Sequence, residues 1–160
     1  MVNLADISVR DYVTNGVKDV FSTMLSMKVE VLDPTTTVTF EGEKMVGSVG
    51  FAGKVMGVIN INLTCAFAAQ IAGTMLGMDP KDLLAGTEVN DVIGEMSNMV
   101  GGNLKSHLCD AGLTCALSIP SITRGIKFQI ESIEGTSHER FVFKYQDHFV
   151  AVDLRMKPGE

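Results

Sequence analysis

The chain has 160 residues, of which 46% are hydrophobic and 20% charged, and its formal net charge is -6. This composition is typical of a folded globular protein and excludes an intrinsically disordered one. We expect no nucleic-acid partner, because a phosphate backbone is bound by clustered Lys and Arg residues and the sequence has no such cluster. The length suits one domain, which we expect to span residues 1–160.

The start of the chain carries Asp6, Arg10 and Asp11, where a secretory signal peptide needs an uninterrupted apolar core. The longest apolar run, residues 55–63, is too short to cross a bilayer, so we expect no membrane insertion. The cysteines are odd in number and lack metal-ligand or CxxC spacing, which favours incidental thiols over a redox pair. They are Cys65, Cys109 and Cys115. We therefore expect a cytoplasmic protein.

The first half of the chain alternates between helical and strand patterns. Apolar residues three and four apart predict a helix over residues 6–27, which Asp6 or Ser8 would cap. Period-two patterns predict strands, and a glycine at residue 77 predicts the end of a second helix. The predicted strands cover residues 28–32, 37–40, 45–51 and 54–63, with a tight hairpin at Ala52-Gly53, and the second helix covers residues 64–77.

The second half opens with the longest predicted helix, residues 87–108, capped by Thr87 and acidic in its first turn. Strands should follow, with Pro120 marking an edge or a bulge. They cover residues 115–122, 127–133, 139–145 and 148–156, and the last two should form an antiparallel pair. A helix followed by about three strands thus occurs twice. We predict an α+β fold of pseudo-duplicated helix-plus-strands units, with helices packed on a largely antiparallel sheet.

The long helix has two faces. Apolar positions three and four apart predict a core face, and at 100° per residue Asp91, Glu95, Asn98 and Gly102 fall on the opposite side. A carboxylate binds cations, and a carboxamide both donates to and accepts from water, so this pair could hold a water against an electrophile on another molecule. The alternative is an ordinary solvated face. Asparagine and glycine disfavour a helix interior, which favours the functional interpretation.

Other catalytic patterns are weak. His107 lies on the apolar side of the long helix, which indicates packing or capping, while His138 and His148 fall in a turn and at a strand start. No HxxxH or HExxH spacing occurs, so we expect no metal site. A Ser–His–Asp triad stays open, although the sequence has neither a GxSxG elbow nor a P-loop.

The segment GEMSNMVGGNLKSHL, with the later IPSITRG, resembles the CheX-type chemotaxis phosphatases of the CheC/CheX/FliY family. The matching positions are Glu95 and Asn98, with Asp91 four residues earlier and Pro120 downstream. The order of elements, the hairpin GSVGFAGKVMGVININLT and the MLG end of the second helix match too, so the resemblance covers nearly the whole chain. Two-site members carry a second Glu-x-x-Asn on the first helix. RDYVTNGVKDVFSTML has none, which is the single-site CheX pattern.

The resemblance implies a substrate, the aspartyl phosphate of a CheY-like response regulator. It implies that Glu95 pairs with the lysine of the receiver active site and that Asn98 orients the attacking water. Asp91 and Gly102 would be accessory, with Gly101 and Gly102 leaving room for the receiver surface. The Mg²⁺ ion would belong to the receiver, so we expect no cofactor on this chain. Family members of this type are dimers, and a homodimer is expected.

Two other functions stay open. The chain could be a non-catalytic module that binds receivers or resembles a flagellar switch protein, using the same helix face without hydrolysis. The intact Glu95 and Asn98 favour catalysis over this reading. It could also be an α+β domain that binds a small ligand in the crevice between helices and sheet.

Overall fold

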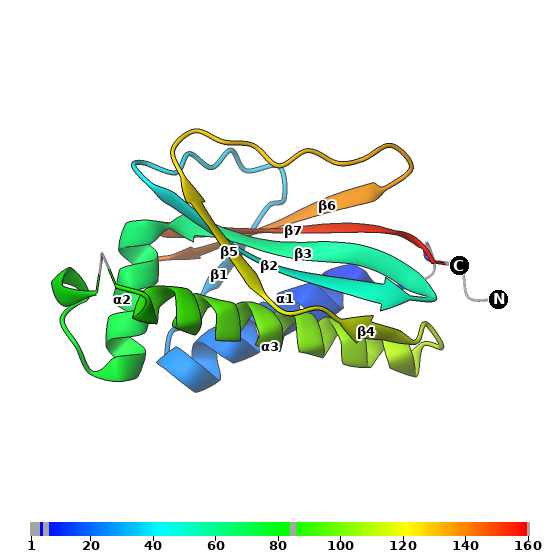
Figure 1. The fold of residues 1–160 in the computed structure, drawn as a ribbon, viewed down its shortest axis with the longest axis horizontal. Helices are drawn as coiled ribbons and strands as arrows, with labels where there is room; N and C mark the ends of the chain where they lie inside the picture. Colours follow the sequence, from blue (N-terminus) through cyan, green and yellow to red (C-terminus); the bar gives the residue numbers. More distant parts are fainter. Residues whose placement is uncertain (1–3, 5–6, 84–85, 160) are drawn as a thin grey trace.

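The computed structural model describes residues 4, 7–83 and 86–159. Helices cover one face of an antiparallel sheet, as Figure 1 shows, so the predicted α+β class is confirmed. The elements are, in order, α1 (Val9–Leu25), β1 (Glu30–Leu32), β2 (Lys44–Gly53), β3 (Val55–Thr64), α2 (Cys65–Leu76), the short 3-10 helix η2 (Pro80–Asp82), α3 (Glu88–Asp110), β4 (Cys115–Leu117), β5 (Ser121–Gly125), β6 (Ser137–Tyr145) and β7 (His148–Pro158).

The sheet has the strand order β1-β6-β7-β3-β2-β4, and β5 pairs with β2 beside β4. All pairs are antiparallel. The hairpins β2–β3 and β6–β7 form its centre and meet along β3 and β7. The predicted hairpin between β2 and β3 is confirmed, but its turn lies later than predicted: Ala52 and Gly53 end β2, Lys54 separates the strands and β3 begins at Val55.

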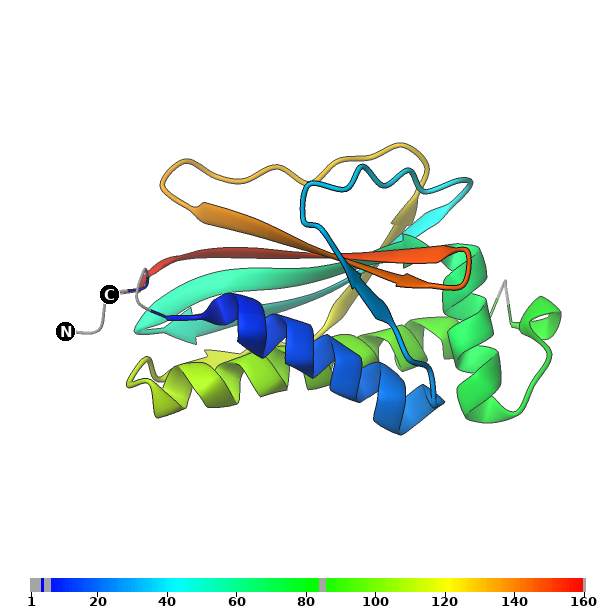
Figure 2. The ribbon, with the colours of Figure 1, turned by 180° about the vertical axis from the view of Figure 1, so that it is seen from behind.

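The topology contains the internal duplication that the sequence predicted. Exchanging β1 with β5, β2 with β6 and β3 with β7 turns the order β1-β6-β7-β3-β2-β5 into its own reverse. The first strand of each unit therefore pairs with the second strand of the other unit. The helices that begin the two units, α1 and α3, lie against each other on the same face of the sheet (Figure 2).

The helices begin and end largely where the sequence predicted. Thr64 caps α2 by accepting a hydrogen bond from the Phe67 backbone N–H at 3.0 Å, and Gly77 ends it in the left-handed conformation at φ 67°. Ser8 precedes α1, but its hydroxyl donates to Asp11 instead of accepting from the backbone. The other proposed cap, Asp6, lies outside the described residues. Thr87 precedes α3 without a side-chain capping bond.

Two predicted strands are wrong. Residues 37–40 and 127–133 are irregular, and both belong to long segments over the sheet face turned away from the helices (Figure 1). Side chains of the sheet hold the backbone of the second segment, since Lys44 donates to the Phe128 carbonyl and Arg155 to that of Ile130. Alternating polarity here reflects a segment that covers a sheet on one side, which sequence periodicity does not distinguish from a strand.

That outer face of the sheet carries a polar cluster around the buried Asp153. The Asp153 carboxylate accepts two hydrogen bonds from Arg140 at 2.8 Å, lies 2.8 Å from His138 Nε2, and accepts a third bond from Asn62 at 3.0 Å. Burial by itself would raise the pKa of Asp153, but the bonds from Arg140 and His138 outweigh it and lower the pKa below its usual value. The cluster fixes β6 and β7 beneath the covering segments.

Among the described residues, the three α-helices all lack the combination of length and apolar character needed to cross a membrane.

Replacing Asp153 with Asn tests the polar cluster. Asp153 is buried, but Arg140 and His138 are each more than a third exposed, so solvent screens the pair and its loss should lower the free energy of unfolding by about 1–3 kcal/mol. A carboxyl whose pKa is lower in the folded protein stabilises it above the unfolded value of about 3.9 and loses that contribution as the pH falls. Urea unfolding of the parent protein should therefore show stability declining below about pH 4, with a smaller decline in Asp153→Asn. The exposed Asp147→Asn is the matched control, and an equal effect of both variants would contradict the prediction.

Candidate functional site

The polar face of α3 points away from the core. Asp91 and Glu95 are exposed, while Asn98 and Gly102 are half-buried. The opposite side of the helix is buried against the sheet, α1 and α2. Its large apolar side chains are Val89, Val92, Ile93, Met96, Val100, Leu104 and Leu108. The structure thus places all four candidate residues on one accessible side of a long helix.

Asn98 lies on the side of α3 that faces the connector, residues 118–120, which joins β4 to β5. Gly94, Asn98 and Gly102 are four residues apart and form one row along the helix. A Cβ atom added at Gly94 would lie 3.9 Å from Pro120, and one added at Gly102 would lie 3.9 Å from Leu117. Three extended residues cover roughly the 12 Å that separates the two glycines, so the connector passes level with Asn98.

The connector is fixed to β2. β4 pairs with the end of β2, and β5 pairs with its beginning. Between these two paired stretches, Ser118 is hydrogen-bonded to Gly50 of β2. The Ser118 backbone N–H donates to the Gly50 carbonyl at 2.8 Å, and the Ser118 hydroxyl accepts from the Gly50 N–H at 2.8 Å. Pro120 has no N–H to continue the ladder, so the predicted single strand over residues 115–122 is divided in two. The break at Pro120 is the one that the sequence predicts, whereas the position of the interrupted segment beside α3 has no signal in the sequence.

Gly101 has a different role from the one expected. It does not face a receiver, because it is buried and a Cβ there would lie 3.1 Å from Val49 Cγ1 of β2. Gly47 of β2 faces Ser97 so closely that a Cβ would overlap the Ser97 hydroxyl. These close contacts bring α3 down onto β2 and leave no space for a ligand in the helix–sheet crevice at this point.

Neither Glu95 nor Asn98 uses its side chain within the part of the chain that the structure describes: no hydrogen bond or ion pair engages either one. The carboxylate and the carboxamide keep their full bonding capacity for solvent or a partner. By contrast Asn90, one turn before Gly94 on the same helix, accepts two bonds from Arg124 at 3.1 and 2.8 Å. Position on the helix therefore separates a structural asparagine from an available one.

The first helix has a matching face without the same chemistry. Six buried residues of α1 each lie 80 positions before a buried residue of α3, counted from Val9 to Val89. They are Val9, Val13, Gly16, Val17, Val20 and Phe21, and their counterparts are Val89, Ile93, Met96, Ser97, Val100 and Gly101. The same shift matches Glu95 with Asn15 and Asn98 with Lys18, both exposed. The duplicated position thus has an amide and a cation where α3 has an acid and an amide.

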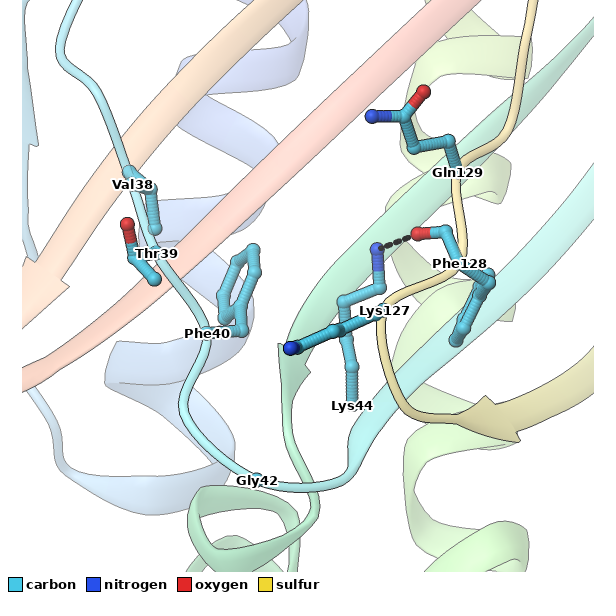
Figure 3. Close-up of a pocket in the computed structure, with 8 residues that line it drawn as sticks. All are labelled: Val38, Thr39, Phe40, Gly42, Lys44, Lys127, Phe128 and Gln129. Carbon is cyan, nitrogen blue, oxygen red and sulfur yellow. Dashed lines mark hydrogen bonds between the residues drawn. The ribbon is translucent and has the colours of Figure 1, made fainter.

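A separate pocket lies on the other face of the sheet, between residues 38–42 and 127–129 (Figure 3). Its volume is about 340 Å³, and neither Glu95 nor Asn98 lines it. Lys44 lines this pocket. Its ammonium group donates to the Phe128 carbonyl at 3.3 Å and lies 4.3 Å from the centre of the Phe128 ring. Burial, with Arg140 adding to it, lowers the pKa of Lys44.

The cysteines and histidines take structural positions. All three cysteines are free, and burial raises the pKa of the Cys65 thiol to about 12 and also raises that of Cys115. His107 stacks on Tyr12 of α1 with ring centres 4.2 Å apart, which is the packing role expected from sequence. Within residues 4, 7–83 and 86–159, no group of three or more His, Cys, Asp or Glu side chains could hold a metal ion.

Comparison with protein families adds to this geometry. Residues 45–145 match the family model described as chemotaxis phosphatase CheX. The chain belongs to the CheX family. The matched segment contains α3 and the connector, so it includes every residue of the candidate site.

Solved CheX structures have the same fold. CheX from Vibrio vulnificus is 25% identical, with a TM-score of 0.80 over 94% of this chain and 97% of that one. The CheX–CheY–BeF3–Mg complex from Borrelia burgdorferi matches at 21% identity, with a TM-score of 0.76 over 94% and 99% of the two chains. FliY from Thermotoga maritima matches at 16% identity, with a TM-score of 0.64 over 99% and 92%. A search of curated proteins found no match.

Replacing Gly47 with Ala tests the close contact beneath the site. The added methyl group would overlap the Ser97 hydroxyl, which donates to the Ile93 carbonyl at 2.8 Å, so the free energy of unfolding should fall by about 1–3 kcal/mol. Removing that hydroxyl with Ser97→Ala should restore part of the loss, and a double-mutant cycle from urea unfolding measures the coupling. Gly94→Ala is the control, because its methyl group has room and alanine favours helix. Additive effects of the Gly47 and Ser97 changes would contradict the contact.

Proposed function

We propose that this chain hydrolyses the aspartyl phosphate of a CheY-like response regulator. The observation that carries the proposal is the outward and unpaired state of Glu95 and Asn98 on one face of α3. Membership of the chemotaxis phosphatase family supports it. The Borrelia burgdorferi relative, solved as a complex with CheY, supports the choice of partner.

In the proposed reaction, Asn98 enters the receiver site and holds a water in line with the phosphorus–oxygen bond to aspartate. Its carboxamide oxygen accepts from the water and its NH2 group donates, which together fix the orientation of the water. The water oxygen bonds to phosphorus, the bond to the aspartyl oxygen breaks, and aspartate leaves as a carboxylate with inorganic phosphate. An amide does not take up a proton near neutral pH, so both protons of the water stay with the product, which leaves as H2PO4⁻ and then ionises in solvent.

Glu95 would pair with the lysine of the receiver and fix the angle at which α3 approaches. Both side chains come from one helix only three residues apart, so the ion pair also positions Asn98. Placement alone can supply a large part of the acceleration, since effective concentrations of well-oriented groups reach about 10⁵ M or more. Loose phosphoryl-transfer transition states require positioning and charge stabilisation more than covalent chemistry.

The remaining parts of the proposal concern accessory groups. Mg²⁺ would be held by the receiver, where it bridges phosphoryl oxygens and offsets developing charge. Asp91, exposed one turn before Glu95, and Gly102, one turn beyond Asn98 on the same side of the helix, would border the receiver surface. We also propose a homodimer, in keeping with the family resemblance.

Replacing Asn98 with Ala should abolish hydrolysis and spare binding. We expect the dephosphorylation rate of a saturating phosphorylated receiver to fall by at least about 100-fold, because the water loses its orientation. Phosphate release from a receiver phosphorylated by a small-molecule donor measures the rate. The matched control is Asn15→Ala, which removes an exposed asparagine from the outer face of α1, at the position equivalent to Glu95.

A wild-type rate in Asn98→Ala would contradict the proposed mechanism. Wild-type protein that binds receivers without accelerating phosphate loss would instead select the non-catalytic binding module.

Replacing Glu95 with Gln should weaken receiver binding about tenfold, because the change removes one charge and keeps the shape. Interactions of exposed charges are screened by salt, so the affinity of the parent protein should fall as salt rises, and that dependence should be smaller in the variant. Isothermal titration at two salt concentrations measures both effects. Glu139→Gln on β6 is the control, and equal salt dependence of Glu95→Gln and the parent would contradict an ion pair at this position.

A further inference from the structure

Two apolar side chains, one almost fully and one partly exposed, flank the Glu95–Asn98 pair. Ile119 in the connector is 88% exposed, and Met99 on α3 is 37% exposed. The row Gly94–Asn98–Gly102 faces the connector, whereas Met99 is turned 100° away from Asn98 around the helix. The polar pair therefore has an apolar flank on each side, whereas isolated exposed hydrophobic residues would need no explanation.

The exposure of Ile119 follows from how the backbone is held. On one side, Ser118 is tied to Gly50 by two hydrogen bonds of 2.8 Å. On the other side, Pro120 lies against Gly94 and donates no hydrogen bond to a neighbouring strand. Ile119 is thus left between two fixed residues with its side chain outside the sheet. Because this backbone is already ordered, a partner that buried Ile119 would lose little conformational entropy there.

We propose that Ile119 is an anchor on which the receiver domain docks, with Met99 as a second apolar contact. This inference rests on the proposed function and names the docking surface for the same site. The connector passes level with Asn98, so a protein that brings a phosphorylated side chain to Asn98 must also cover the connector. The occupant is a receiver domain with an apolar depression beside its phosphorylated carboxylate and a lysine that meets Glu95.

The polar pair and the apolar anchor have different roles in the proposed reaction, because their side chains differ in chemistry. Glu95 and Asn98 are polar and act at the reacting group, whereas Ile119 contributes apolar burial that is the same before and during reaction. Uniform binding of this kind lowers KM without changing kcat. Ile119 is therefore a positioning residue for the partner, and its loss has a kinetic signature distinct from that of Asn98.

The test compares Ile119→Ser with Ile133→Ser. Ile133 is the matched control, because it is 79% exposed and lines a pocket with Val58 and Arg155 on the other side of the sheet. Titration of each variant with a receiver loaded with BeF3 and Mg²⁺ measures affinity, and phosphate release measures KM and kcat. We expect Ile119→Ser to raise Kd and KM about tenfold or more, equivalent to about 1.4 kcal/mol, with kcat within about twofold of the parent. Ile133→Ser should match the parent.

The outcomes separate this inference from the proposed function. If the parent hydrolyses a receiver phosphate and Ile119→Ser has unchanged Kd and KM, the anchor is overturned and the function stands. If Ile119→Ser loses kcat at constant KM, the connector acts on the chemistry and the anchor is again overturned.

If the parent protein binds a receiver without hydrolysing its phosphate, the phosphatase proposal fails, while the ratio of the Kd values of Ile119→Ser and the parent still decides whether Ile119 is an anchor. If it binds no receiver, both fail, and if Ile119→Ser only becomes monomeric, the surface belongs to self-association and the anchor is overturned.

Discussion

The close contact between α3 and β2 is the constraint on which the site depends. Gly47 leaves space for Ser97, and Gly101 brings the helix backbone within reach of Val49. Protein interiors are packed so tightly that a single methyl group at either glycine would have to move the helix or its neighbours. Because α3 is rigid along its length, its height above the sheet also fixes how far Asn98 stands from the connector. A glycine in the sheet thus helps to determine the geometry of a surface side chain.

The duplicated topology explains why the molecule has two similar helices and one candidate site. α1 and α3 bury matching residues against the same sheet, so both faces satisfy the same packing requirement. The outer faces of the two helices are not subject to that requirement and differ. Asn15 and Lys18 of α1 take the positions that Glu95 and Asn98 take on α3. β4 and the connector have no counterpart in the first unit, where α1 leads to β1 directly. The two units therefore differ in two ways: in the side chains on the outer face of the helix, and in the presence of β4 and the connector beside α3 alone.

The two faces of the sheet have different roles, one in packing the helices and the other in stabilising the sheet through polar contacts. The helical face is apolar and positions α3, while the outer face carries a polar cluster around the buried Asp153. A buried carboxylate is tolerated there because Arg140, His138 and Asn62 supply its hydrogen bonds. These bonds fix the two central hairpins against each other from the side opposite the helices. The polar cluster stabilises the platform and the helical face carries the candidate chemistry.

The sequence by itself determined the three helices, the two central hairpins, the duplicated order and the outward face of α3. Each of these depends on periodicity or on capping residues within one short segment. Residues 37–40 and 127–133 show the limit, because a segment that covers a sheet and a strand within one have the same alternation. Only the tertiary structure decided that Gly101 serves packing, that Asn15 and Lys18 occupy the positions on α1 equivalent to Glu95 and Asn98, and that residues 117–120 run beside the row of α3 that holds Asn98. Those facts join residues distant in the chain, and distance in space is set by packing, which no local pattern records.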